Sequence, residues 1–195
     1  MPILDRKPID DTVAESDAEL VARALRDDGD AFGVLVMRYA GAARRVARAV
    51  LRDPDDADDA VQDALLKAFV KLRQFDSRQP FGPWLMRIVA NAATDRRRRR
   101  FVRRTHPLDD ELVAGGPSPD AVTHRRRLAE RLREALAQLP ERRRLAVVLF
   151  DVEGYSHAEI GRMLGLLEGT VRAEVFHARR ALRPLLAGWR EKEEG

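Results

Sequence analysis

The spacing of the apolar side chains constrains the fold of this chain more than any other feature. Apolar residues recur every three or four positions along almost the whole sequence. One such series comprises Ala60, Ala64, Leu65, Ala68, Phe69 and Leu72. This period forms an apolar stripe on an α-helix, whereas a half-buried strand needs apolar and polar residues in alternation. Alternating runs long enough for a strand are hard to find, so the sequence predicts an all-α protein.

Capping and turn residues indicate where the helices begin and end. Ser16 to Glu19 and Ser156 to Glu159 both have the form of a capping box, and Gly165 supplies the left-handed residue of a tight turn. Asp53-Pro54 ends one helix. The expected helices start at Ser16 and at Ser118-Pro119 (to Leu139), and otherwise cover about 30–51, 55–72, 84 into the arginines, 141–151, 157–164 and 167–187.

The segment HPLDDELVAGGPSPD (106–120) divides the chain. It is rich in Pro, Gly and Asp, which is the composition of a domain linker. We therefore expect two small helical domains, 16–105 and 121–187, joined by a flexible linker. Residues 1–15 and 188–195 are expected to be a flexible N-terminus and a C-terminal tail.

Residues 156–182 have the pattern of a helix-turn-helix, whose second helix enters the DNA major groove. The face of that helix opposite its apolar stripe carries Thr170, Arg172, Ala173, Phe176, His177 and Arg180. Arg172 and His177 can donate hydrogen bonds to purine edges or phosphates, and Phe176 can pack on a thymine methyl. The alternative interpretation is a helical hairpin whose polar face is only solvated.

Charge is strongly segregated, although the formal net charge is only +4. Residues 53–63 carry six Asp, and residues 96–104 carry seven Arg. This polarity indicates two different partners, an anion and a basic or polar protein surface. The arginines directly follow the apolar stretch that begins at Phe81, a combination that neither a core helix nor a solvated tail needs. We therefore expect something outside the chain to explain it.

Several function classes are disfavoured. The 195 residues include four His and no Cys, which excludes disulfides and thiolate zinc sites. There is no HxxxH or HExxH spacing, no phosphate-binding glycine loop and no nucleophile motif around a serine. DPDDADD lacks the glycine and terminal glutamate of an EF-hand loop. We expect no enzyme activity, metal, cofactor or small-molecule substrate, and, since no apolar run approaches a membrane span, a cytoplasmic protein.

Four stretches together resemble the extracytoplasmic-function (ECF, group 4) sigma factors of the sigma-70 family. They are DAELVARALRDDGDAFGVLVMRY, DADDAVQDALLKAFVKLRQFD, PWLMRIVANAATDRRRR and LPERRRLAVVLFDVEGYSHAEIGRMLGLLEGTVRAEVFHARRAL. The resemblance runs from about Asp17 to Leu186. It implies two helical domains, a σ region 2 bundle and a σ region 4 helix-turn-helix, in a subunit that directs core RNA polymerase to promoters and helps melt the minus-ten element. A stand-alone helix-turn-helix regulator is the alternative.

The resemblance also implies sites. The loop from Phe75 to Phe81 and the following helix contact the minus-ten element, and the helix-turn-helix face reads the minus-thirty-five element. The minus-ten candidates are Phe75, Arg78, Phe81, Trp84, Arg87, Asn91, Asp95, Arg96 and Arg99. Arginines can hold phosphates, and a loop with aromatics can enclose an extruded base. Core packing is the alternative for Trp84, and nonspecific anion affinity is the alternative for the arginines.

The acidic third helix, by resemblance, docks on the clamp helices of the polymerase β′ subunit. Its candidates, at spacings that include three and four, are Asp56, Asp59, Gln62, Asp63 and Leu66. A solvated acidic helix is the alternative. The implied partners are core RNA polymerase, through the β′ clamp helices and the β flap, promoter DNA and an anti-sigma factor.

Two positions depart from the family pattern G-T-V-[KR]-S-R. Ala173 removes a hydroxyl donor and Glu174 reverses a charge, which leaves the minus-thirty-five sequence open. Glu174 lies on the flank of the helix, so it is expected to alter a phosphate contact or to form an internal pair. Leu166-Leu167 stands where the family usually has a proline in the turn.

Overall fold

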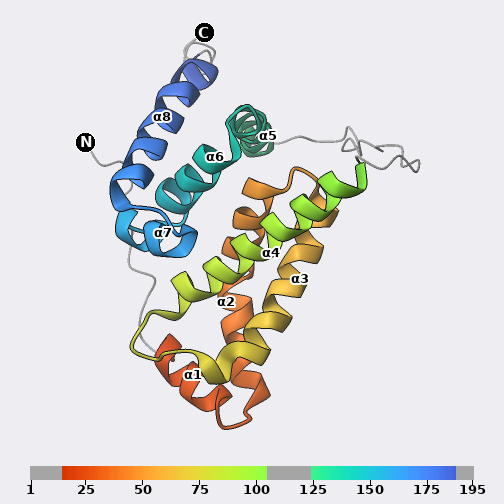
Figure 1. Ribbon diagram of the computed structural model, residues 1–195, viewed down its shortest axis with the longest axis vertical. Coiled ribbons are helices and arrows are strands. Elements are labelled where there is room, and N and C mark those ends of the chain that lie inside the picture. Colours follow the sequence, from red (N-terminus) through yellow and green to blue (C-terminus); the bar gives the residue numbers. More distant parts are fainter. Residues whose placement is uncertain (1–14, 105–123, 188–195) are drawn as a thin grey trace.

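The computed structural model describes residues 15–104 and 124–187 of the chain (Figure 1). This part contains eight α-helices, a 3-10 turn (η1) and a π-helical turn (η2), and no strand, which confirms the all-helical prediction. The elements are α1 (Asp17–Ala24), α2 (Gly29–Val50), α3 (Pro54–Lys71), η1 (Leu72–Gln74), α4 (Phe81–Arg104), α5 (His124–Ala137), α6 (Glu141–Val147), η2 (Val148–Val152), α7 (His157–Leu164) and α8 (Glu168–Ala187). The expected linker, with the Ser118-Pro119 cap, and nearly all of the two expected tails lie outside the described residues.

The predicted helix starts at the two capping boxes are confirmed. In α1 the Ser16 hydroxyl accepts from the Glu19 amide at 3.3 Å, and the Glu19 carboxylate accepts from the Ser16 amide at 2.8 Å. Ser156 and Glu159 repeat both bonds at the start of α7. These side chains satisfy amide donors that have no partner inside the first turn of a helix.

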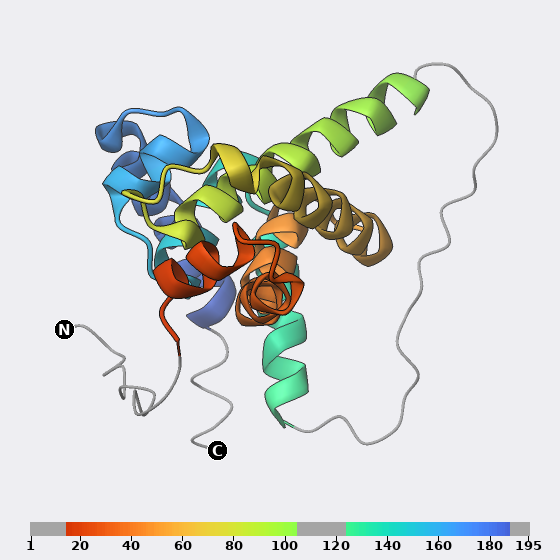
Figure 2. The same cartoon turned by 90° about the horizontal axis from the view of Figure 1, so that it is seen from below.

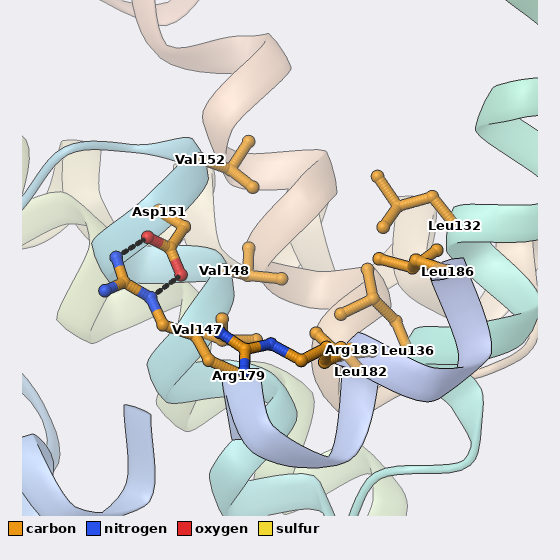
Figure 3. Close-up of a pocket in the computed structure, with 10 residues that line it drawn as sticks. All are labelled: Leu132, Leu136, Val147, Val148, Asp151, Val152, Arg179, Leu182, Arg183 and Leu186. Carbon is orange, nitrogen blue, oxygen red and sulfur yellow. Dashed lines mark hydrogen bonds and ion pairs between the residues drawn. The ribbon is translucent and has the colours of Figure 1, made fainter. Parts of the chain in front are cut away.

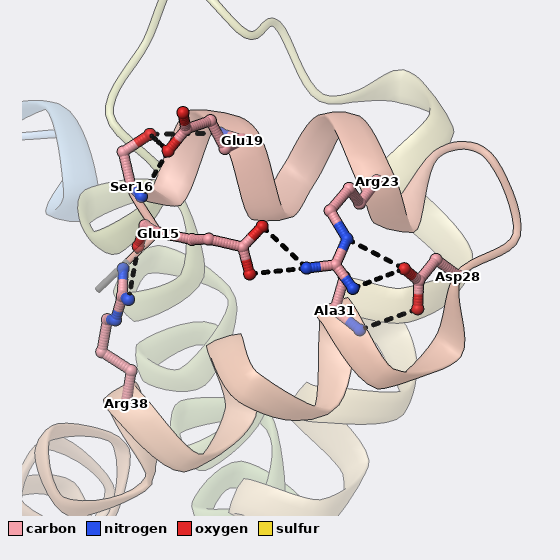
Figure 4. Close-up of polar contacts among 7 residues, drawn as sticks. All are labelled: Glu15, Ser16, Glu19, Arg23, Asp28, Ala31 and Arg38. Carbon is pink, nitrogen blue, oxygen red and sulfur yellow. Dashed lines mark hydrogen bonds and ion pairs between the residues drawn. The ribbon is translucent and has the colours of Figure 1, made fainter. Parts of the chain in front are cut away.

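A second polar cluster fixes the turn between α1 and α2 (Figure 4). Asp28 caps α2 by accepting from the Ala31 amide at 3.2 Å. Arg23 donates to the same Asp28 carboxylate at 2.7 Å and also pairs with Glu15. The hydrogen bond from Arg23 is the main reason that the pKa of Asp28 lies below its usual value, and the Ala31 amide adds to the effect. The cluster ties the start of α1 to the start of α2.

Two element boundaries differ from the sequence prediction. α4 begins at Phe81 rather than near Trp84, because Pro83 falls in its first turn, where a missing amide donor removes no helical hydrogen bond. The helix expected over 141–151 is α-helical only to Val147 and then widens into η2. The Glu153 amide donates to the Val148 carbonyl at 3.0 Å, across five residues, which closes the wider turn.

The first helical unit packs α4 across α2 and α3 (Figure 1). The buried side of α3 is almost entirely alanine, at Ala57, Ala60, Ala64 and Ala68. Such small side chains let two helix backbones approach closely. α4 fills the space with Leu85, Met86 and Val89, all at most 1% exposed. This close approach brings the acidic first turns of α3 beside the arginine run of α4.

The second unit contains the helix-turn-helix, α7 and α8. Gly165 ends α7 in the left-handed region, with φ 66°, as predicted. The following Leu166 amide donates to the Gly161 carbonyl at 2.9 Å. A Cβ on Gly161 would lie 2.7 Å from the Leu166 carbonyl oxygen, so only glycine fits there. The turn is therefore set by two glycines and does not depend on the proline usual in the family.

The two units pack directly against each other, which the sequence did not predict (Figures 1 and 2). α2 faces α6 and η2, and α4 faces α7. Leu149 and Ile160 of the second unit join the same buried core as Val46 and Leu85 of the first. Arg45 of α2 forms an ion pair of 2.6 Å with Glu153, whose side chain is 6% exposed. Contact between the units therefore combines an apolar core with salt bridges.

Candidate nucleic-acid and polymerase interfaces

α8 presents the predicted recognition face. Its inner side is held by Val171, Val175 and Ala178, all nearly or fully buried. On its outer side, five of the candidate residues are exposed and the sixth, Thr170, is partly exposed; the five are Arg172, Ala173, Phe176, His177 and Arg180. Phe176 is 60% exposed, a costly position for a phenyl ring unless a partner covers it.

Glu174 lies on the flank of α8 and turns inward. Its carboxylate pairs with Arg143 of α6 at 3.3 Å, and its side chain is 20% exposed. Of the two roles that the sequence left open, the structure therefore supports the internal pair. Arg172 also forms an ion pair of 2.8 Å with Glu168, one helical turn earlier in α8. Both side chains are exposed, so the pair is weak and the Arg172 guanidinium can leave Glu168 for another acceptor.

An aromatic cluster supports the loop between η1 and α4. The ring centroids of Phe75 and Trp84 lie 4.9 Å apart, and Phe81 lies 5.4 Å from Trp84 and 5.7 Å from Tyr39. Phe81 is only 3% exposed, whereas Phe75 and Trp84 are partly exposed. The structure thus places Phe81 in the core beneath the loop and leaves Phe75 and Trp84 as the partly exposed rings of the cluster.

The loop itself is held by Asp76. Its carboxylate accepts from the Arg78 guanidinium at 2.9 Å and from the Arg78 amide at 3.1 Å. The guanidinium contact, followed by the amide contact, lowers the pKa of Asp76. The Arg78 side chain is 88% exposed, so it stands out at the tip of the loop.

α4 carries one exposed stripe at a spacing of four. The residues along it are Arg87, Asn91, Asp95 and Arg99, all predicted to contact the minus-ten element. The Arg99 guanidinium donates to the Asp95 carbonyl at 3.4 Å and so lies along the helix. Arg87, at the start of the stripe, follows Trp84 by three residues and so lies one helical turn from the aromatic cluster. The stripe presents guanidinium, amide and carboxylate groups.

Arg96, also predicted to contact DNA, points instead toward α3. Its guanidinium donates to Asp56 at 3.0 Å and to Asp59 at 2.6 Å. Arg100 pairs with Asp56 and with Asp53, and Arg97 pairs with Glu141 of α6. The expectation that the arginine run is explained only by an external partner is therefore wrong for these three residues, which hold α4 to α3 and to the second unit.

The outer face of α3 carries the candidate docking residues. Gln62, Asp63 and Leu66 are exposed, Leu66 at 67%, and the Asp59 side chain is 57% exposed. Asp56 differs, since its side chain is 19% exposed between α3 and α4. Phe69 and Val70, which sequence reasoning did not assign to this site, extend it at 55% and 75% exposure. Their three- and four-residue spacing from Leu66 was the available signal.

The second unit also has a groove that the sequence did not predict (Figure 3). It has a volume of about 320 Å³. Its apolar lining comes from α5, α6, η2 and α8: Leu132, Leu136, Val147, Val148, Val152, Leu182 and Leu186. At its rim Arg179 of α8 donates to Asp151 at 3.0 Å. The lining comes from segments far apart in the sequence, so no local pattern reveals the groove.

Within residues 15–104 and 124–187, no group of three or more His, Cys, Asp or Glu side chains is placed to hold a metal ion. No helix in the same part of the chain is both long and apolar enough to cross a bilayer.

Comparisons with known proteins match both helical units. The family model "Sigma-70 region 2" matches residues 35–102, and "Sigma-70, region 4" matches residues 129–182. ECF RNA polymerase sigma factor SigM of Mycobacterium tuberculosis is 40% identical over 171 residues, which cover 88% of this chain and 85% of that protein.

Two solved structures share the arrangement. CnrH of Cupriavidus metallidurans, in complex with the cytosolic domain of CnrY, has a TM-score of 0.66 and 30% identity, covering 89% of this chain and 99% of that one. RpoE of Bartonella quintana, in complex with the anti-sigma factor NepR, has a TM-score of 0.65 and 28% identity, covering 80% and 96%. With a helix-turn-helix, a separate exposed stripe on α4 and these matches over both units, the chain belongs to the ECF sigma factors of bacterial RNA polymerase.

Proposed function

We propose that this sigma factor uses three separate surfaces: α3 to dock on core polymerase, the loop 75–81 with α4 to melt the minus-ten element, and α8 to read the minus-thirty-five element. The observation that carries this proposal is the exposed stripe on α4, which continues from a cluster of partly exposed aromatic rings. A protein that only binds duplex DNA has no use for such a surface.

Docking by α3 rests on charge and on exposed apolar area. Asp59 and Asp63 can pair with basic groups on the β′ clamp helices, while Leu66, Phe69 and Val70 can bury apolar surface against them. Exposed carboxylates alone give weak and salt-sensitive contacts. The neighbouring apolar side chains therefore supply much of the affinity, and the carboxylates orient the complex.

Melting by the loop and α4 needs a place for an unstacked base and a grip on the backbone. Phe75 and Trp84 offer ring faces for stacking, and Asn91 can donate and accept hydrogen bonds at a base edge. Arg87 and Arg99 lie on the same stripe and can hold the adjoining phosphates. Phe81, which is buried, supports the two outer rings from below.

Reading of the minus-thirty-five element rests on Arg172, His177 and Phe176, which share the outer face of α8. Ala173 offers only a methyl group, so contact at that position is apolar. The groove formed by α5, α6, η2 and α8 has an apolar lining that suits the apolar side chains of a partner segment, and we assign it to the β flap of polymerase.

The protein acts in the cytoplasm as a non-enzymatic subunit, and we propose that an anti-sigma factor regulates it. Support comes from CnrH, solved with the cytosolic domain of CnrY, and from RpoE, solved with the anti-sigma factor NepR. The exposed apolar residues of α3 would also associate indiscriminately if left uncovered. Co-purification from the native cell tests this point, and recovery with polymerase alone at every growth stage would count against it.

Transcription from a genomic promoter library tests the proposed function. Core RNA polymerase with this protein is expected to initiate at a small set of promoters that core polymerase alone does not use. A stand-alone regulator, which the comparisons do not favour, would instead bind specific duplex DNA tightly by itself and show no affinity for polymerase.

A further inference from the structure

Arg96 connects two surfaces that we have assigned to different partners. Its guanidinium is shared between Asp56, at 3.0 Å, and Asp59, at 2.6 Å. Asp56 is 19% exposed and lies between α3 and α4, whereas Asp59 is 57% exposed and belongs to the docking stripe. Arg96 is therefore held by one carboxylate that a docking partner can reach and by one that it cannot.

Arg96 also lies close to the DNA-facing stripe of α4. Arg99 is three residues further along, which places it about 60° around the helix from Arg96. A long guanidinium side chain covers that angle by changing rotamer, without any movement of the backbone. In the described structure the two aspartates keep Arg96 on the α3 side and offset its charge.

We infer that Asp59 is a switch carboxylate, which couples docking of α3 on polymerase to phosphate binding by α4. This inference rests on the docking and DNA-binding roles proposed above. When a basic group of the polymerase binds Asp59, Arg96 loses one of its two carboxylates and becomes available to a phosphate beside Arg99. Off the polymerase, Asp59 keeps Arg96 partly neutralised and so limits binding to nonspecific DNA. By linkage, DNA bound at α4 strengthens docking by the same factor.

The comparison of Asp59→Asn with Asp63→Asn tests the inference. Both substitutions remove one negative charge from the same exposed stripe, one helical turn apart, but only Asp59 accepts a hydrogen bond from Arg96. The assay is fluorescence anisotropy of a mixed-sequence single-stranded oligonucleotide with the full chain, over a series of salt concentrations, with and without saturating core polymerase. Thermal unfolding of each variant checks that it folds.

Free Asp59→Asn protein is expected to bind the oligonucleotide about two- to five-fold more tightly than wild type, the range of one exposed ion pair. The slope of log affinity against log salt concentration should be steeper by roughly one phosphate contact. Asp63→Asn should change both quantities less, because Asp63 acts on Arg96 through its charge alone and accepts no hydrogen bond from it. When bound to polymerase, Asp59→Asn and wild type should have equal affinity for DNA. In the wild type, docking has then drawn Asp59 away from Arg96, and in the variant the carboxylate is absent.

Three results would overturn the inference. Equal gains from Asp59→Asn and Asp63→Asn would reduce it to a general charge effect. A gain that persists on polymerase would show that docking does not release Arg96, and a gain that remains in an Arg96→Gln background would show that Arg96 does not carry it. Failure of the proposed docking site is a different result: neither variant would then weaken association with core polymerase.

Discussion

Replacement of Arg144 by alanine is expected to weaken the contact between the two helical units. Arg144 lies in α6 and is only 6% exposed. Its guanidinium donates to the Ala49 carbonyl at the C-terminal end of α2 and to the Leu139 carbonyl at 3.1 Å. The C-terminal end of a helix carries a partial negative charge, so a guanidinium is favourable there. Burial, followed by the nearby charges of Arg52 and Arg97, lowers the pKa of Arg144, which shows the opposing cost of placing this cation inside the protein.

The size of the effect follows from the two carbonyls. A buried carbonyl that loses its donor costs about 1–3 kcal/mol, so losing two donors costs about 2–4 kcal/mol once the relief from burying a cation is counted. Arg142→Ala is the matched control, because Arg142 is exposed on the same helix. Urea unfolding followed by circular dichroism measures the loss of free energy, and small-angle scattering measures the separation of the units as a larger radius of gyration. Equal unfolding midpoints and equal radii for the two variants would refute this account of Arg144.

Other substitutions test single elements of the structure. Gly161→Ala would place a Cβ 2.7 Å from the Leu166 carbonyl oxygen, so we expect the full chain to lose about 1–3 kcal/mol of stability and to bind duplex DNA less well. Unchanged stability and binding would mean that the turn adapts freely. The Ser156 hydroxyl and amide lower the pKa of Glu159 from 4.5, so the stability that this cap contributes is present above pH 4.5 and is lost as the pH falls through the lowered pKa. Glu159→Gln should therefore flatten that part of an acid-unfolding curve. An identical curve for the variant would exclude the cap as the source of this pH dependence. Gln62→Ala combined with Asp63→Lys should weaken association with core polymerase but not duplex binding through α8; equal loss of both would indicate misfolding.

Local features of the fold were predictable from the sequence. The capping boxes at Ser16 and Ser156, the left-handed Gly165 and the outer face of α8 all depend on residues within one or two helical turns of each other. Short-range hydrogen bonds and the helical period determine such features, so a single sequence contains the information. The exposed stripe on α4 was found for the same reason.

Long-range contacts were not predictable in this way. The pairing of Arg96 with Asp56 joins residues 40 positions apart, and the bond from Arg144 to Ala49 spans 95 positions. The charge pattern of the sequence around these arginines is as compatible with an external partner as with internal pairing. A charge run has the same composition whether it is solvated, docked on a partner or paired internally. Burial of Phe81 was missed because an aromatic residue beside a loop fits both a base pocket and a core.

Permanganate reactivity of unpaired thymines, combined with gel-shift affinity, tests most directly whether melting and duplex reading use separate surfaces. Asn91→Ala, from the stripe on α4, should reduce thymine reactivity on a duplex promoter with little loss of initial binding. A template already unpaired over the minus-ten element should rescue this variant in part. Arg172→Ala, from the outer face of α8, should weaken initial binding by about 1–3 kcal/mol, and the unpaired template should not rescue it. Normal melting by Asn91→Ala together with defective melting by Arg172→Ala would contradict the account.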